Sequence, residues 1–202
     1  MIVAALYVQP RGHYVGRSDV DAWPERRDAR TYAGPHPVVA HPPCASWCRL
    51  AALREAVYGL PIGEDGGCFA AALAAVRSWG GVLEHPAWSK AWPKFGLMPP
   101  PAFGWQGNLE RPREWVCEVA QSAYGHRAQK LTWLLYVGDV PPFPLRWERP
   151  RGTGVVSGAH FSRGRKSKRP NGERIWQTEA SRTPPAFAEA LIQLANHSRG
   201  AV

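Results

Sequence analysis

The chain has 202 residues and a mass of 22.3 kDa, which suffices for one domain with a buried core and is too little for two domains of ordinary size. Lys and Arg number 25 against 16 Asp and Glu, so the formal net charge is +9 and the pI is about 9.8. This excess of positive charge favours a polyanionic partner, with nucleic acid ahead of an acidic membrane surface.

The N-terminal segment combines two short strands with a polar stretch. Residues 2–8, IVAALYV, predict the first strand. This run is too short to cross a bilayer and lacks a preceding basic segment, which predicts a soluble, cytoplasmic protein without a membrane partner. Residues 19–36 are predicted to be irregular, and residues 37–40 predict a buried strand. That strand stops at Pro42 and Pro43, because proline cannot donate to a sheet ladder.

Two helices and a third strand are predicted in the middle of the chain. Residues 49–60 predict a short helix with Leu50, Leu53 and Val57 on one face. Residues 68–79, CFAAALAAVRSW, are apolar on almost every side, which predicts a buried helix that glycine ends. The segment GVLEHP at 81–86 predicts another short strand, with a polar pair at its C-terminal edge.

The second half begins with a Pro- and Trp-rich loop, and loops this long in compact domains are usually functional or mobile. The predicted elements are the loop at 87–112, strands at 114–126 and 130–139 joined by a basic turn, a basic loop at 162–174 and a helix at 184–196 with Thr183 as N-cap. Strands and helices therefore alternate. This predicts a single α/β domain over residues 1–202, with a reduced, Rossmann-like, mostly parallel sheet and irregular Pro/Trp-rich loops.

Two predicted strands end in chemically reactive side chains. These ends are HPPC at 41–44 and LEHP at 83–86. A crossover helix between them would make their strands neighbours and would place Cys44 and Glu84 in one cleft. A thiolate beside a carboxylic acid is the pair needed to attack C6 of a pyrimidine while engaging its N3. The sequence therefore predicts Cys-initiated chemistry on a pyrimidine base.

Four segments carry a resemblance to a known family: PVVAHPPCASW, GGVLEHP, YGHRAQKLTWLLYVG and RTPPAFAEALIQLA. Together they resemble the DNA cytosine-5 methyltransferases, and most closely the short methyltransferase-like proteins of phages and prophages. The resemblance implies a class I methyltransferase-like fold, DNA as substrate, base flipping and S-adenosyl-L-methionine as cofactor. It also implies expression in the cytoplasm of a bacterial host from a phage or prophage gene.

The resemblance implies roles for individual residues. Cys44 would be the nucleophile and Glu84 the N3-binding acid, with Lys130 and the offset Arg127 holding the flipped base or a flanking phosphate. Asp28 would contact the adenine of S-adenosyl-L-methionine. The full predicted cofactor set is Tyr7, Gly12, Asp28 and Pro42. No metal is expected.

The chain also departs from the family pattern. Its first loop, YVQPRGHY, has one glycine where the family is glycine-rich, and little room is left for a helix and a second strand before Asp28. A separate target-recognition domain does not fit, so a protein partner could supply the missing elements. Two alternatives to the methyltransferase stay open: a non-catalytic DNA-binding relative, and a Cys-dependent pyrimidine-modifying enzyme that does not use S-adenosyl-L-methionine.

Other residues are candidates for contacts with nucleic acid. The predicted DNA-binding residues are Arg163, Arg165, Lys166, Lys168 and Arg169 of the basic loop, together with Trp47, Trp88 and His85. Trp92 and Trp105 could also stack on an extruded base. Cys44 and Cys48 with His41 or His85 could instead bind zinc, although their spacing is one residue too long for the Cys-x-x-Cys of nucleobase deaminases. Cys68 and Cys117 are predicted in the core, and all four cysteines are predicted to be free thiols.

Overall fold

The computed structural model describes residues 1–156, 173–175 and 177–200. Within them, seven strands form a mixed sheet in the order β2-β1-β3-β4-β7-β6-β5. The strands are β1 (Val3–Val8), β2 (Val20–Pro24), β3 (Val38–Ala40), β4 (Gly81–Pro86), β5 (Gln106–Gly107), β6 (Glu114–Ala120) and β7 (Leu131–Val137). Helices accompany this sheet, which confirms the predicted α/β class.

The sheet is parallel in one half only, which corrects the prediction of a mostly parallel sheet. Strands β2, β1, β3 and β4 pair in parallel, whereas β7 pairs antiparallel with both β4 and β6, and β5 antiparallel with β6. The reason is the short connection between β6 and β7, which contains only the 3-10 helix η2 (Gln121–Tyr124) and a turn. Parallel neighbours would need a crossover of a dozen or more residues.

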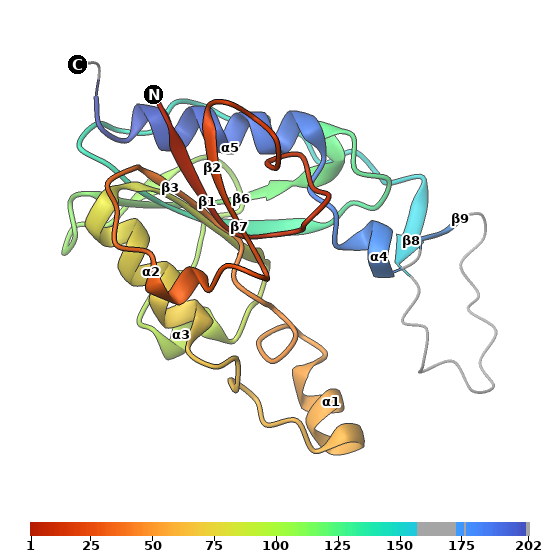
Figure 1. Ribbon diagram of the computed structural model, residues 1–202. Coiled ribbons are helices and arrows are strands. Elements are labelled where there is room, and N and C mark those ends of the chain that lie inside the picture. The colour runs from red at the N-terminus through yellow and green to blue at the C-terminus, as the bar shows by residue number, and fades with distance from the viewer. Residues whose placement is uncertain (157–172, 176, 201–202) are drawn as a thin grey trace.

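Helices cover both faces of the sheet (Figure 1). The helix α2 (Cys68–Trp79) packs with the 3-10 helix η1 (Ala29–Thr31) and α3 (Ala91–Lys94) on one face. Its Phe69, Ala72, Leu73, Ala75 and Val76 are buried, which confirms the predicted buried helix. The connection from α2 into β4 passes through Gly81, where a Cβ would overlap the backbone of Val38 in β3. Glycine therefore allows β4 to approach β3 closely.

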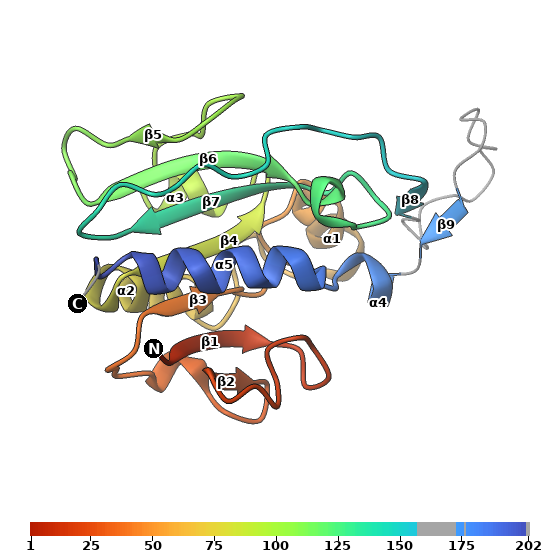
Figure 2. The same ribbon diagram turned by 90° about the horizontal axis from the view of Figure 1, so that it is seen from above.

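The helix α5 (Pro185–His197) covers the opposite face and lies across β1, β3 and β4 (Figure 2). Residues 9–19, which connect β1 to β2, contain no helix that could cover this face. The C-terminal helix α5 covers it instead. The predicted C-terminal helix is thus confirmed, but its N-cap is Pro184 rather than Thr183, and no side-chain hydrogen bond caps it.

Two segments predicted to be irregular contain regular structure. The stretch at 19–36 contains β2 and η1, and the loop at 87–112 contains α3 and β5. The predicted short helix is confirmed as α1 (Ala51–Tyr58), and its apolar face is exposed: Leu50 is 50%, Leu53 38% and Val57 52% accessible. Figure 1 shows α1 projecting away from the sheet, so the sheet does not cover this face.

The C-terminal part adds a small second sheet, in which β8 (Gly154–Val156) pairs in parallel with β9 (Glu173–Ile175), and a short helix α4 (Gln177–Ala180). Residues 162–172 of the predicted basic loop lie outside the described residues. The last two residues of that prediction, Glu173 and Arg174, belong to β9. In the part of the chain that the structure describes, no helix has the length and apolar character that a membrane span requires.

Candidate functional site

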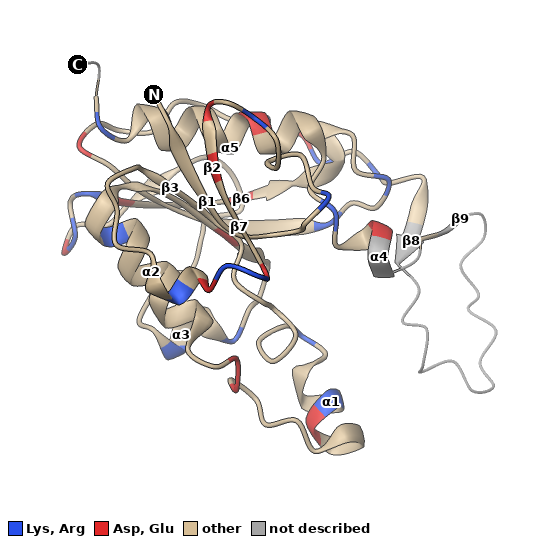
Figure 3. Ribbon diagram, in the orientation of Figure 1, with Lys and Arg blue, Asp and Glu red and all other residues tan. Residues whose placement is uncertain are grey.

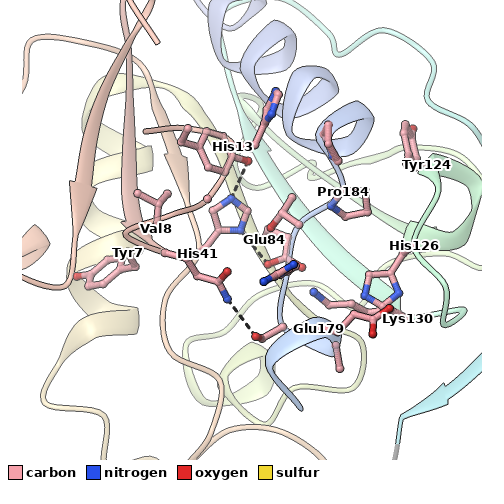
Figure 4. Close-up of a pocket in the computed structure, with 18 of the residues that line it drawn as sticks. Tyr7, Val8, His13, His41, Glu84, Tyr124, His126, Lys130, Glu179 and Pro184 are labelled. Carbon is pink, nitrogen blue, oxygen red and sulfur yellow. Dashed lines mark hydrogen bonds and ion pairs between the residues drawn. The ribbon is translucent and has the colours of Figure 1, made fainter. Parts of the chain in front are cut away.

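A pocket of about 1270 Å³ opens at the carboxyl ends of the parallel strands (Figure 4). It is lined by residues that follow β1 and β3, by Glu84 and Pro86 of β4, by the turn between β6 and β7, and by the segment that leads from α4 into α5. Because β2 and β3 lie on opposite sides of β1, the chain changes direction across the sheet at this point. Open α/β sheets bind ligands at such switch points.

Cys44 and Glu84 line this same pocket. Their strands β3 and β4 are parallel neighbours, with Ala40 opposite Leu83, so the residue after each of these positions reaches the same edge of the sheet. The predicted juxtaposition of the two strand ends therefore exists in the structure.

The protonation states of this pair are the reverse of those predicted. Burial, reinforced by the negative charge of Glu84, raises the pKa of the Cys44 thiol to about 11. Burial also opposes ionisation of Glu84, but the hydrogen bond from His41 and the charge of Lys130 prevail and lower its pKa to about 2. At neutral pH the pair is thus a thiol and a carboxylate. The predicted pair, a thiolate and a carboxylic acid, also carries one proton in total. In the structure that proton is on Cys44 and not on Glu84.

A chain of hydrogen bonds surrounds the Glu84 carboxylate. One oxygen, Oε2, lies 3.1 Å from His41 Nδ1, and the other, Oε1, accepts a bond from Gln121 Nε2 at 2.9 Å. His41 Nε2 lies 2.9 Å from the Tyr14 hydroxyl, and Gln121 also donates to the Thr132 hydroxyl at 2.9 Å. Sequence reasoning considered His41 only as a zinc ligand and missed Tyr14 and Gln121. The one available signal was the position of His41 at a proline-terminated strand end.

The pocket carries more positive than negative charge. Its cationic side chains are Arg11, Arg127, Lys130 and Arg182, against the carboxylates of Glu84 and Glu179. Arg127 forms an ion pair with Glu179 at 2.9 Å. Figure 4 shows Lys130 beside Glu179 and His126, and Figure 3 shows basic positions, in blue, on the loops between the sheet and α4. This lining favours an anionic ligand.

The residues predicted to hold S-adenosyl-L-methionine do not form one site. Tyr7, Gly12 and Pro42 line the pocket, but Figure 4 shows the Tyr7 ring directed away from Glu84. Asp28 does not line it: this side chain caps η1 by accepting from the Arg30 amide and forms an ion pair with Arg30 at 2.8 Å. Asp28 is thus separated from the pocket that Tyr7, Gly12 and Pro42 line.

Two residues predicted to touch nucleic acid lie in the core instead. Trp47 packs on Phe69, and its indole N–H donates to Asp65 at 2.8 Å. His85 is fully buried between Phe69 and Trp92, and burial lowers its pKa to about 4, so its ring is neutral. Both predictions are corrected by this burial.

Of the remaining candidates, Trp88 is 48% accessible, and the Arg49 guanidinium lies 5.1 Å from its ring centroid. Trp92 is buried and Trp105 is partly buried against the face under α5. The five basic residues predicted to bind DNA, Arg163, Arg165, Lys166, Lys168 and Arg169, lie outside the described residues.

The cysteines are free, as predicted. Cys117 is buried in the core, whereas Cys68, predicted there too, is partly exposed at the start of α2. Among residues 1–156, 173–175 and 177–200, no group of three or more His, Cys, Asp or Glu side chains is arranged to hold a metal ion. His41, the nearest candidate ligand to Cys44 in sequence, uses both ring nitrogens in the hydrogen bonds described above.

Comparisons with protein-family models, with curated proteins and with solved structures found no significant match to this chain.

Proposed function

We propose that the protein modifies C5 of a pyrimidine in DNA, as a DNA cytosine-5 methyltransferase-like enzyme of Rossmann-like fold in which Cys44 is the nucleophile. The observation that carries the proposal is the presence of Cys44 and Glu84, from neighbouring parallel strands, in one basic pocket. A cysteine thiol and a carboxylate are the two groups that addition to a pyrimidine ring requires.

The proposed reaction begins with the resting pair. The Cys44 thiol gives its proton to Glu84 as its sulfur bonds to C6, and Glu84 passes that proton to N3. The electron pair of the C5–C6 double bond then forms a bond from C5 to an electrophilic carbon of the donor. The bond between that carbon and the rest of the donor breaks, and the leaving group departs with those electrons. Loss of the C5 proton to solvent restores the C5–C6 double bond and expels the Cys44 sulfur as a thiolate, and N3 returns its proton through Glu84 to that sulfur. Lys130 stabilises the negative charge that develops on the ring.

The proposed substrate is DNA for two reasons. DNA contains the pyrimidine ring that this reaction modifies, and its negative charge complements the positive charge of the protein. A base in a duplex must be turned out of the stack to reach such a pocket. The basic run at 163–169 and the net charge of +9 would supply contacts with the phosphate backbone, so we expect the affinity to fall steeply with rising salt concentration. We propose that Trp88, which is exposed and follows the end of β4, stacks on a base.

The proposed donor of the electrophilic carbon is S-adenosyl-L-methionine. One observation favours a second candidate, a Cys-dependent enzyme with a different donor: Asp28 lies outside the pocket and is engaged by Arg30. In either version we propose that a partner protein provides target recognition.

The test uses duplex DNA in which 5-fluorocytosine replaces cytosine. Fluorine cannot leave C5 as a proton does, so the adduct persists and is detected by denaturing electrophoresis and intact mass. We expect a covalent complex with the wild-type protein and S-adenosyl-L-methionine, and none with Cys44→Ser. A complex that forms only with another donor would support the second candidate. An adduct that survives Cys44→Ser would overturn both.

A further inference from the structure

We propose that His41 is the positioning residue for Glu84: its Nδ1–H group holds the carboxylate oxygen Oε2, and Tyr14 fixes which ring nitrogen of His41 carries the proton. The consequence for base modification rests on the proposed function, whereas the hydrogen-bonding role of His41 can be measured on the protein alone.

The tautomer of His41 follows from its two partners. An ionised carboxylate can only accept hydrogen bonds, so the His41 Nδ1 that faces Glu84 must carry a hydrogen atom. In a neutral imidazole the other nitrogen, Nε2, is then an acceptor, and the Tyr14 hydroxyl 2.9 Å away is a donor that suits it. Tyr14 is almost fully buried, and His41 Nε2 is the hydrogen-bond partner that the structure gives its hydroxyl.

The arrangement leaves the carboxylate little freedom. His41 holds Oε2 from the end of β3, and Gln121 holds Oε1 from η2, so donors from two separate elements fix the carboxylate plane. The side chains of His41 and Glu84 are only 12% and 9% accessible. A carboxylate held at both oxygens can present a constant orientation to a ligand in the pocket, as substrate positioning requires.

The charged groups around His41 support the same assignment. Glu84 faces it from β4 and Tyr14 from the loop after β1, with Lys130 acting on Glu84 from the turn before β7. Arg17 and Glu189 lie beyond Tyr14 and form an ion pair with each other at 3.0 Å. The only negative charge that His41 contacts in this set is therefore Glu84.

Two substitutions separate the two hydrogen bonds of His41. In His41→Asn, the amide N–H group takes the place of Nδ1 and keeps the bond to Glu84. In His41→Gln, the longer amide takes the place of Nε2, which keeps the contact with Tyr14 and loses the bond to Glu84. Tyr14→Phe removes only the outer hydroxyl and leaves the ring packing against His41.

The primary readout is the titration of the Glu84 carboxyl carbon by ¹³C NMR, assigned with Glu84→Gln and followed to the acid limit of the folded protein. Loss of a hydrogen bond to a charged group is expected to raise the midpoint by about one to two pH units in His41→Gln. His41→Asn should stay close to wild type, and Tyr14→Phe should lie between wild type and His41→Gln, because Glu84 alone then holds the His41 tautomer. Equal midpoints in His41→Asn and His41→Gln would overturn the proposal.

A second readout is the rate of covalent trapping on 5-fluorocytosine DNA. We expect His41→Gln to be slowed about tenfold or more, which corresponds to the loss of a single hydrogen bond to a charged group, and His41→Asn to recover most of the rate. Thermal unfolding of each variant identifies any that fails to fold. If wild type shows no trapping while the NMR midpoints separate as expected, the proposed function fails and the role of His41 stands.

Discussion

Glu84 and His85 are neighbours in β4, yet they belong to two regions with opposite chemistry. Glu84 faces the pocket, where each carboxylate oxygen has a hydrogen-bond partner. His85 faces the cluster under α2, and neither of its ring nitrogens has a partner in the part of the chain that the structure describes. Successive side chains of a strand point to opposite faces. A single step along the chain thus separates a candidate catalytic group from a neutral packing residue.

The comparison teaches which polar residue to associate with function. Burial alone does not distinguish the two, since both side chains are almost inaccessible. The difference lies in the groups around each side chain. Glu84 is surrounded by hydrogen-bond donors and a cation, which keep it ionised. His85 is buried among aromatic rings, and this burial keeps it uncharged. Substitutions at the two positions should therefore affect different properties.

Removing the charge of Glu84 should have the largest effect. We expect Glu84→Gln to reduce covalent trapping on 5-fluorocytosine DNA by about a hundredfold or more, because the amide cannot carry the proton between sulfur and N3. The same variant should make Cys44 more reactive toward iodoacetamide, because the negative charge that helps raise the thiol pKa is gone. Peptide mass spectrometry resolves Cys44 from the other thiols. A slower alkylation of Cys44 would contradict the coupling of the pair.

Substitution of His85 should change the pH dependence of stability instead. Its pKa is about 4 in the fold against an ordinary value of about 6.5, so below about pH 6.5 the unfolded chain binds a proton that the folded protein does not bind. Stability is therefore lost as pH falls through this window, by up to about 3 kcal/mol. His85→Phe should flatten this part of the profile in denaturant unfolding at several pH values. An unchanged slope would show that other groups cause it.

Loss of the exposed Trp88 ring should have a smaller effect, confined to DNA. Removing one stacking platform is expected to weaken binding of single-stranded DNA by about 1–3 kcal/mol in Trp88→Ala, measured by fluorescence anisotropy. Phe103→Ala is the matched control, because Phe103 is a more exposed aromatic residue in the same Pro- and Trp-rich segment. Equal losses in both variants would remove any special role for Trp88.

The smallest effect is expected on the exposed face of α1. Leu53→Ser and Val57→Ser should change the free energy of unfolding by no more than about 0.5 kcal/mol each, because these side chains gain little burial in the folded chain. Leu73→Ser, in buried α2, provides the contrast and should be strongly destabilising. Chemical denaturation measures all three. Large losses at Leu53 and Val57 would mean that their face is covered in solution.

The fold and the pocket were predictable where local signals were strong. Proline-terminated strands and an apolar helix between them placed Cys44 and Glu84 at one edge of the sheet, and the C-terminal helix was evident from its apolar stripe. The edge strand β2 was missed because its three middle residues are only partly buried and show no alternation. The burial of Trp47 could not be foreseen either, since it depends on Asp65 and Phe69, both later in the chain.

The hydrogen-bond chain of the site was out of reach for a different reason. Tyr14 and His41 are 27 residues apart, and His41 and Glu84 are 43 apart. No periodic pattern links such positions, because their contact depends on the order of strands in the sheet and on the path of the loop after β1. The protonation states of Cys44 and Glu84 depend on the same contacts, which explains why they were predicted the wrong way round.

The most direct measurement of the central claim is the identity of the residue that becomes attached to the base. The protein is incubated with 5-fluorocytosine DNA and a methyl donor, digested with protease and nuclease, and analysed by peptide mass spectrometry. The account predicts a nucleotide adduct on the peptide that contains Cys44, absent in Cys44→Ser and strongly reduced in Glu84→Gln. An adduct on Cys48 or Cys68, or one unaffected by both substitutions, would contradict it.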